Sequence, residues 1–205
     1  VIEKWAGGLI RAAAYRVSSH LIRNMGTIGG NMVRPCPFNH FPVALAALGA
    51  SAVVVKPRKT ETVPVEKLFA KSYARELGRK WLVAEFRIPA ATETMTGVFD
   101  KVAKTESSRE NIMLCAAVAD MQNGVCKALR VALGAAVPRT VVLAAAEEIV
   151  KGKTVTAELA RRAAEKAAAQ AGRFNALCAP ARYKKDIAPV VIRRCILAAA
   201  GQEAR

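Results

Sequence analysis

The sequence predicts an α+β fold, and three observations lead to this prediction. Short runs rich in β-branched residues fill the middle of the chain, as in SAVVVKP at 51–57 and KWLVAEFRIP at 80–89. The dipeptide Asn123-Gly124 lies between two apolar runs, which is a strong signal for a hairpin. From residue 140 onward the pattern is helical. Strands followed by helices are typical of an α+β protein.

The amino-terminal part predicts two helices separated by an irregular segment. In residues 3–20 four apolar side chains recur at helical intervals: Leu9, Ile10, Ala13 and Val17. The run PVALAALGA has the same periodicity and is expected to end as a helix at Gly49. Residues 22–42 contain six glycines and prolines, a density that we expect to exclude regular structure.

Strands and one helix-like run complete the first predicted domain. We expect strands over residues 51–57, within 59–68, and most clearly over 80–89. The run FAKSYAREL at 69–77 is helix-like. Residues 90–96, AATETMT, are expected to connect two domains. This places the domains at 1–95 and 96–205.

The second predicted domain begins with strands and ends with helices. The runs GVFDKVAK, LCAAVADMQ and GVCKALRVALGAA predict strands, and TVVLAAAEEIVKG predicts the first helix. A second helix is expected over 154–172, because Thr156 shortly before Glu158 resembles an N-cap and Gly172 a C-terminal stop. A third is expected over 179–201.

The charge of the chain narrows the possible partners. Among 205 residues there are 32 Lys and Arg against 16 Asp and Glu, a formal net charge of +16. This excess favours an anionic partner: nucleic acid, an acidic membrane face, an acidic protein or a phosphate-bearing cofactor. Aromatic residues make up only 5%, which argues against a base-stacking surface. Charges interrupt every apolar stretch, so no membrane insertion is expected.

Cysteine and histidine usage argues against a metal site in this chain. The cysteines form no CxxC pair, and only two histidines are present. Scattered cysteines in odd number are typical of reduced thiols in a cytoplasmic protein. The five are Cys36, Cys115, Cys126, Cys178 and Cys195.

One short segment has a composition that suits a bound ligand. It consists of Thr27, Ile28, Gly29, Gly30 and Asn31. Adjacent glycines permit positive φ and let a ligand approach the backbone, whose N–H groups can then bind an anion. The side chains of Thr27 and Asn31 can bond phosphate or ribityl oxygens, and Arg23 and Arg34 add positive charge nearby. An ordinary Gly-Gly turn is the alternative.

The region around this segment resembles a known family. The string IRNMGTIGGNMVRPCPFNHFPVALAALGASAVV at 22–54 is similar to the signature of the FAD-binding medium subunit of molybdenum hydroxylases, the xanthine dehydrogenase and carbon monoxide dehydrogenase family. Four later runs resemble landmarks of that subunit in the same order: RIP at 87–89, FDKVAKTESSRENIM at 99–113, LGAAVPR at 133–139 and ARYKKDIAPVVIRRCILAA at 181–199. The resemblance covers nearly the whole chain.

The resemblance implies a particular fold. Residues 1–95 would form the second subdomain of a vanillyl-alcohol-oxidase-like FAD-binding domain, and 96–205 a small C-terminal α+β domain with an antiparallel sheet and helices. The family carries an earlier subdomain with its own Gly-rich loop, and this chain starts too late to contain it. We therefore expect half of the FAD site here, with three explanations open: a truncated sequence, a second chain that supplies the other half, or a lost cofactor role.

The resemblance also implies a role in electron transfer. Electrons would pass from a large molybdopterin subunit, through [2Fe–2S] clusters of a small subunit, to FAD here and then to an acceptor such as NAD. The metal ligands would belong to the partner subunits, and no residue of this chain would be catalytic. Residues Thr27–Asn31 would wrap the FAD, Val83 would make a backbone contact, and Lys101 would stabilise negative charge on the reduced ring.

Two residues depart from the family pattern, and they keep other functions open. Cys36 and His40 stand where the family usually has acidic residues, and the acid expected at the position of His40 normally helps to hold the flavin. The alternative function is a degenerate scaffold that docks redox subunits without FAD. A nucleic-acid-binding module is the third possibility, and it depends only on the net charge.

Overall fold

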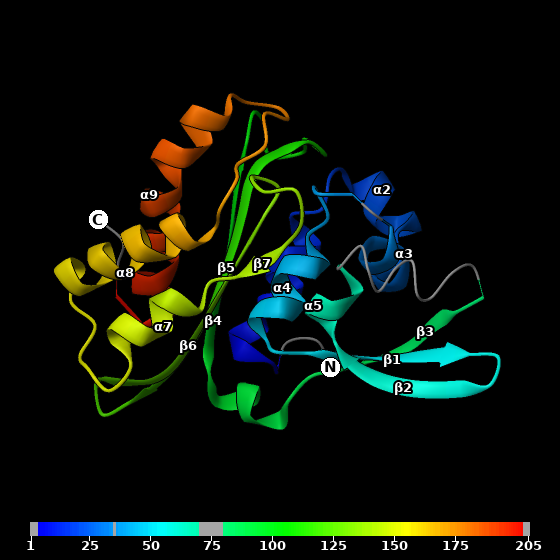
Figure 1. The fold of residues 1–205 in the computed structure, drawn as a ribbon, viewed down its shortest axis with the longest axis horizontal. Helices are drawn as coiled ribbons and strands as arrows, with labels where there is room; N and C mark the ends of the chain where they lie inside the picture. Colours follow the sequence, from blue (N-terminus) through cyan, green and yellow to red (C-terminus); the bar gives the residue numbers. More distant parts are fainter. Residues whose placement is uncertain (1–3, 35, 70–79, 203–205) are drawn as a thin grey trace.

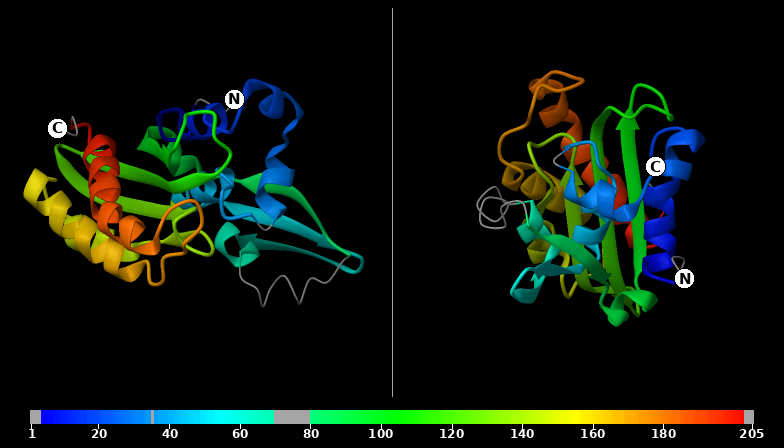
Figure 2. Two further views of the ribbon diagram at one scale, coloured as in Figure 1. Left: turned by 90° about the horizontal axis from the view of Figure 1, so that it is seen from above. Right: turned by 90° about the vertical axis from the view of Figure 1, so that its right-hand side faces the viewer.

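The computed structural model describes residues 4–34, 36–69 and 80–202. Within them lie two antiparallel sheets, one with strand order β2-β1-β3 and one with order β4-β5-β6-β7 (Figure 1). Helices α7, α8 and α9 cover one face of the larger sheet, and α1 and α4 pack against the other. The smaller sheet projects from the end of the molecule opposite α8 (Figure 2). The predicted α+β class is confirmed.

The first helical region is shorter than the spacing of its apolar residues suggested. A 3-10 turn, η1 (Ala6–Gly8), leads into α1 (Leu9–Tyr15). Helix α1 buries three of the four predicted apolar residues, namely Leu9, Ile10 and Ala13. The fourth, Val17, lies beyond the end of the helix.

The expectation of irregular structure over residues 22–42 is wrong. This region contains the end of α2 (His20–Met25), all of α3 (Ile28–Val33) and the start of α4 (Phe41–Ala47). Helix α3 forms because Thr27 caps it, so glycine at its second and third positions does not prevent a helix. Helix α4 is followed by Gly49 at φ +65, as predicted.

The smaller sheet is built around β1 (Ser51–Lys56). Strand β1 pairs on one side with β2 (Lys59–Pro64) and on the other with β3 (Leu82–Arg87), so β1 is the central strand. A single-turn helix, α5 (Val65–Leu68), follows β2. The helix predicted over 69–77 lies, apart from its first residue, outside the described residues.

The larger sheet begins after a short 3-10 helix, η2 (Ala90–Thr94). Its strands are β4 (Thr96–Ala103), β5 (Asn111–Gln122), β6 (Val125–Gly134) and β7 (Val141–Val142). Asn123 and Gly124 join β5 to β6 with φ values of +51 and +77, the left-handed pair that a tight hairpin requires. The predicted hairpin is confirmed.

Strand β5 contributes to two hydrophobic cores. Met113, Cys115 and Ala117 belong to the core beneath α8 and α9, whereas Leu114 and Ala116 belong to the core around α4. Alternate residues of a strand point to opposite faces, so a strand covered on both faces is apolar throughout. This explains why its sequence shows no polar alternation.

Three helices complete the chain: α7 (Ala144–Val150), α8 (Ala157–Gln170) and α9 (Ala181–Ala199). Thr156 caps α8 as predicted, because its Oγ1 accepts a hydrogen bond from the Leu159 N–H at 3.1 Å. None of the helices in the described parts of the chain is long and apolar enough to cross a membrane. The division into 1–95 and 96–205 stays a prediction.

Candidate functional site

The predicted ligand segment forms the start of α3. The Oγ1 atom of Thr27 accepts a hydrogen bond from the Gly30 N–H at 3.0 Å, and the Thr27 carbonyl accepts one from Asn31 N–H at 3.0 Å. The first N–H groups of a helix have no carbonyl partner within it, so those of Ile28 and Gly29 are available to an anion. Arg23 lies in the preceding helix and adds positive charge.

The two glycines of this segment differ from expectation in their backbone. Neither Gly29 nor Gly30 has a positive φ, because both lie in helical conformation. A Cβ at Gly29 would meet no atom within 4 Å, so this glycine leaves the backbone open to approach. A Cβ at Gly30 would lie 3.1 Å from Thr27 Oγ1, so this glycine makes room for the cap.

The Asn31 side chain has a structural partner. Its Oδ1 atom accepts a hydrogen bond from the Phe41 N–H at 3.1 Å, and the Asn31 carbonyl accepts one from the side chain of Asn39. These bonds join α3 to the start of α4. The side-chain oxygen that we expected to bind a ligand therefore already fixes the loop.

Two hollows meet at Ile28. One, of about 340 Å³, is lined by α1 and the start of α3, and includes Tyr15, Arg23 and Thr27. The other, of about 400 Å³, is mainly apolar and is lined by Trp5, Gly29 and residues 83–86 of β3, among others. The structure thus brings Val83 next to the Thr27–Asn31 segment, while its backbone contact with the cofactor stays a prediction.

His40, the residue directly before α4, is buried. It is 2% exposed, and its ring stacks on Phe99 with the ring centres 5.5 Å apart. Burial, and secondly the cation of Lys101, lower the pKa of His40 to about 3, so the imidazole is neutral near pH 7. Its Nε2 atom has no hydrogen-bond partner within the described ranges.

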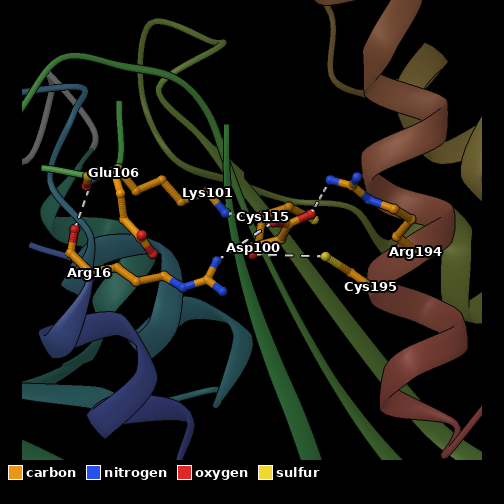
Figure 3. Close-up of polar contacts among 7 residues, drawn as sticks. All are labelled: Arg16, Asp100, Lys101, Glu106, Cys115, Arg194 and Cys195. Atoms are coloured by element: carbon orange, nitrogen blue, oxygen red, sulfur yellow. Dashed lines mark hydrogen bonds and ion pairs between the residues drawn. The ribbon is translucent and has the colours of Figure 1, made fainter. Parts of the chain in front are cut away.

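Lys101 lies on β4 and is held by main-chain carbonyls (Figure 3). Its Nζ atom donates to the carbonyl oxygens of Arg16 at 3.0 Å, Glu106 at 2.6 Å and Ser108 at 2.9 Å. Burial is the main cause that lowers the pKa of Lys101, and the cations of Arg16 and Arg23 add to it, against the opposing charge of Glu106. None of the hydrogen bonds found for Nζ in the described parts of the chain reaches the Thr27–Asn31 segment.

Sequence reasoning missed three charged residues beside Lys101. The Asp100 carboxylate pairs with Arg194 of α9 at 2.5 Å and lies 3.7 Å from Arg16 (Figure 3). Each pair joins residues more than eighty positions apart, so no local pattern could reveal them. The adjacent acid and base in FDKVAK are the only local signal. No cluster of three or more His, Cys, Asp or Glu that could hold a metal was found in the described parts of the chain.

Two family models match the chain in succession. One, described as the FAD binding domain in molybdopterin dehydrogenase, matches residues 2–91. The other, described as the CO dehydrogenase flavoprotein C-terminal domain, matches residues 101–199. The first match contains the smaller sheet and the Thr27–Asn31 segment, and the second begins at Lys101 within β4 and contains the other strands of the larger sheet.

Individual relatives agree with these matches. The chain is 27% identical over 191 residues to the carbon monoxide dehydrogenase medium chain of Hydrogenophaga pseudoflava, and 24% identical over 192 residues to the nicotine 6-hydroxylase medium subunit of Paenarthrobacter nicotinovorans. Each alignment covers 93% of this chain and 66% of the relative. The chain thus spans just under two thirds of the length of these relatives.

Solved structures show the same relationship. Carbon monoxide dehydrogenase from Hydrogenophaga pseudoflava, in a form that lacks the Mo-pyranopterin moiety, superposes with a TM-score of 0.89 and 28% identity over 98% of this chain and 69% of the other. Quinoline 2-oxidoreductase from Pseudomonas putida 86 superposes with a TM-score of 0.78 and 25% identity over 91% and 64%. The chain belongs to the family of FAD-binding medium subunits of molybdenum hydroxylases.

Proposed function

We propose that this chain binds FAD as part of the medium subunit of a molybdenum-containing hydroxylase or dehydrogenase, and that it relays electrons instead of oxidising the substrate. The observation that carries the proposal is the start of α3, where Thr27 caps the helix and Gly29 leaves its first N–H groups open. A helix start of this kind suits a phosphate group.

The residues present fit one part of an FAD molecule. Backbone N–H groups at Ile28 and Gly29, with Arg23 nearby, would hold phosphate oxygens. The mainly apolar hollow beside Val83 would hold a ring system, and the hollow on the other side of Ile28 gives an elongated ligand room to continue. Bound FAD supplies the electron-transfer chemistry, while the protein orients it and sets its surroundings.

His40 and Lys101 are proposed to act close to the flavin. The His40 ring stacks on Phe99, which lies two residues before Lys101 on β4, and the Lys101 cation contributes to the lowered pKa of His40. A carboxylate at the position of His40 would cancel the positive charge of the Lys101 ammonium, whereas the neutral imidazole of His40 does not. Direct contact of either side chain with the flavin stays a prediction.

The partners are proposed from the relatives. We propose a complex with a large molybdopterin-binding subunit and a small [2Fe–2S] subunit, with NAD or another molecule as the final electron acceptor, in the cytoplasm. The medium chains of carbon monoxide dehydrogenase and nicotine 6-hydroxylase, named above, support this assembly. The net charge of +16 is consistent with acidic surfaces on these partners.

The test is an FAD titration of the full chain, alone and copurified with its partner subunits. We expect flavin absorbance in the complex and a rise in melting temperature when FAD is added, because a ligand that binds the folded state stabilises it. Gly29→Val places bulk where FAD would approach, and it should weaken binding about tenfold or more, roughly 1.4 kcal/mol.

Ala157→Val is the matched control for this variant. Ala157 is exposed in the first turn of another threonine-capped helix, α8, far from the site. The Ala157→Val variant should leave FAD binding unchanged. A complex without flavin, or a Gly29→Val variant that binds FAD normally, would contradict the proposal and favour a scaffold role.

A further inference from the structure

Four segments of the chain meet at one end of the larger sheet. Strand β4 ends at Ala103, β5 begins at Asn111 and β6 ends at Gly134, so the β4–β5 and β6–β7 connections leave the same end of this sheet. The connection between α8 and α9 and the segment between α3 and α4 lie at this end as well, at the top of Figure 1.

Hydrogen bonds join these segments to one another. The Pro37 carbonyl accepts one from the Ala135 N–H at 3.0 Å, and the Asn175 side chain donates to the Ala135 carbonyl at 2.8 Å. The Asn111 side chain donates to the Phe38 carbonyl at 3.0 Å. The segments therefore form one continuous surface. We call it the loop face, and it consists of residues 33–34, 36–40, 104–110, 135–140 and 171–182.

The loop face has an unbalanced positive charge. It carries six exposed cations and two exposed carboxylates. None of the six cations forms an ion pair within the described parts of the chain. On α8, by contrast, Arg161 pairs with Glu158 at 2.7 Å and with Glu165 at 2.6 Å. The cations of the loop face are Arg34, Lys104, Arg109, Arg139, Arg173 and Arg182, and the carboxylates are Glu106 and Glu110.

The composition of the loop face fits a protein partner better than a nucleic acid. Apolar side chains lie among the cations, since Val33 is 42% and Leu177 is 49% exposed. Protein interfaces combine apolar contacts with charges, whereas a phosphate backbone is bound by charge. Five of the six cations are arginines, which protein interfaces favour over lysine and which bind a carboxylate through two N–H groups. The matching chemistry is an acidic protein surface.

The charge also indicates a partner that binds and leaves. Permanent subunits bury large apolar interfaces, whereas electron-transfer partners meet over small ones and are steered by opposite charges. The loop face contains the carbonyls of Glu106 and Ser108, which hold Lys101, and it contains His40. It therefore adjoins the two residues that are proposed to act close to the flavin, and a redox protein docked here would approach the flavin from this side.

We propose that the loop face is the docking surface for an acidic protein that accepts electrons from the flavin. This inference rests on the proposed function, because the flavin is the source of the electrons. It goes beyond that function by naming the class of acceptor and the place where it binds. A fully reduced flavin releases two electrons, so two one-electron acceptors are reduced for each flavin that is reoxidised, and the flavin protons pass to water.

The test uses an oxidised, acidic b-type cytochrome as the probe. The full chain carries either Arg173→Gln with Arg182→Gln in the loop face, or Arg58→Gln with Arg162→Gln, which removes two exposed cations elsewhere. Without added FAD, the loop-face variant should bind the cytochrome about tenfold more weakly at low salt, and the control variant should bind it normally. Binding by the wild type should weaken as salt is raised. All three melting temperatures should agree, because the substituted side chains are exposed.

Two further readouts follow docking and electron transfer separately. A carbodiimide joins a lysine to a carboxylate that it contacts, so Lys104 should be cross-linked to the cytochrome. The exposed Lys127, near the opposite end of β6, should not. In the FAD-loaded complex with reduced flavin, the acidic cytochrome should take electrons faster than the basic cytochrome c at low salt. The loop-face substitutions should slow only the acidic cytochrome.

Several outcomes would overturn the inference. Equal binding of the acidic cytochrome by both double variants is one, and cross-links at Lys127 in place of Lys104 are another. Tighter binding of a random-sequence DNA duplex than of the cytochrome, lost in the loop-face variant, would assign the surface to nucleic acid. If the chain docks the cytochrome at Lys104 but binds no FAD, the docking surface is supported and the proposed function fails. If FAD binds while the loop-face substitutions change nothing, the proposed function stands and this inference falls.

Discussion

The Oγ1 atom of Thr27 accepts a hydrogen bond from the backbone N–H of Gly30 at 3.0 Å. This bond satisfies one of the N–H groups that a helix start leaves without partner, and it orients the N–H groups of Ile28 and Gly29. A segment with two adjacent glycines is thereby ordered as a helix. The Thr27 hydroxyl group therefore contributes to the order of the candidate FAD site, together with the bonds that join Asn31 to the start of α4.

Thr27→Ala should weaken FAD binding, whereas Thr27→Ser should retain it. Loss of an N-cap lowers helix stability by about 1 kcal/mol. FAD would then have to order α3 when it binds, and its affinity would be weaker by a similar free energy. FAD titration measures the effect. Thr156→Ala is the control, because it removes the equivalent cap of α8. It should cost about the same stability in urea and leave FAD binding intact; a loss of binding there would argue against a local role of Thr27.

Alanine at the two adjacent glycines should have opposite effects on stability. Gly29→Ala should raise the free energy of unfolding by up to about 1 kcal/mol, because its Cβ meets no atom within 4 Å and alanine favours a helix. Gly30→Ala should lower it, because its Cβ would lie 3.1 Å from Thr27 Oγ1 and displace the cap. Urea denaturation of both variants checks this, and equal changes would contradict the geometry.

The stability of the protein should fall as the pH drops below 6.5. The pKa of His40 is lowered from 6.5 to about 3 in the folded chain. Between these values the unfolded chain binds a proton that the folded chain does not. Each pH unit of acidification therefore lowers the free energy of unfolding by up to about 1.4 kcal/mol, and above pH 6.5 the contribution of His40 is constant. His40→Phe should remove this part of the slope in urea denaturation at pH 4–7.

The exposed His20 provides the control for this pH series. His20→Gln should retain the full slope. A His40→Phe variant with the slope of the wild type would show that burial of His40 does not cause it.

Lys184 should be required for stability although it is charged. Its side chain is fully buried, and Nζ donates to Asn175 Oδ1 at 2.7 Å and to the Leu177 carbonyl at 2.6 Å. Lys184→Met leaves the Leu177 carbonyl without this donor and removes one of the two donors to Asn175 Oδ1, which also accepts from the Leu177 N–H at 3.0 Å, so it should cost about 1–3 kcal/mol in urea denaturation. Lys185→Met, at an exposed neighbour, should stay within about 0.5 kcal/mol. If both variants lowered the free energy of unfolding by similar amounts, the stabilising role of Lys184 would be contradicted.

Features with a local chemical cause could be predicted from the sequence. The left-handed pair Asn123-Gly124, the cap Thr156 and the helix stop at Gly49 each depend on residues close in the chain, and the structure has all three. Helices α2 and α3 were missed because turn-forming residues dominate their composition, whereas one cap at Thr27 decides the outcome.

The contacts of Lys101 and Asn31 were beyond sequence reasoning for a different reason. Lys101 donates to a carbonyl 85 positions away, and main-chain carbonyls have no sequence signature. Asn31 bonds the backbone of Phe41, so the residue type gives its capacity to bond but not its partner. The segment Thr27–Asn31 could therefore be identified, while the way in which its neighbours hold it could not.

Strand β5 has a consequence for how the protein unfolds. Met113 and Leu114, adjacent along the chain, belong to different hydrophobic cores. Loss of β5 would expose both cores at once, so neither half can melt while the other stays intact. Heat and urea should therefore give one cooperative transition. A peptide that ends near residue 95 would lack the sheet on which α1 and α4 pack, and we expect it to fold only when the remaining part of the chain is supplied.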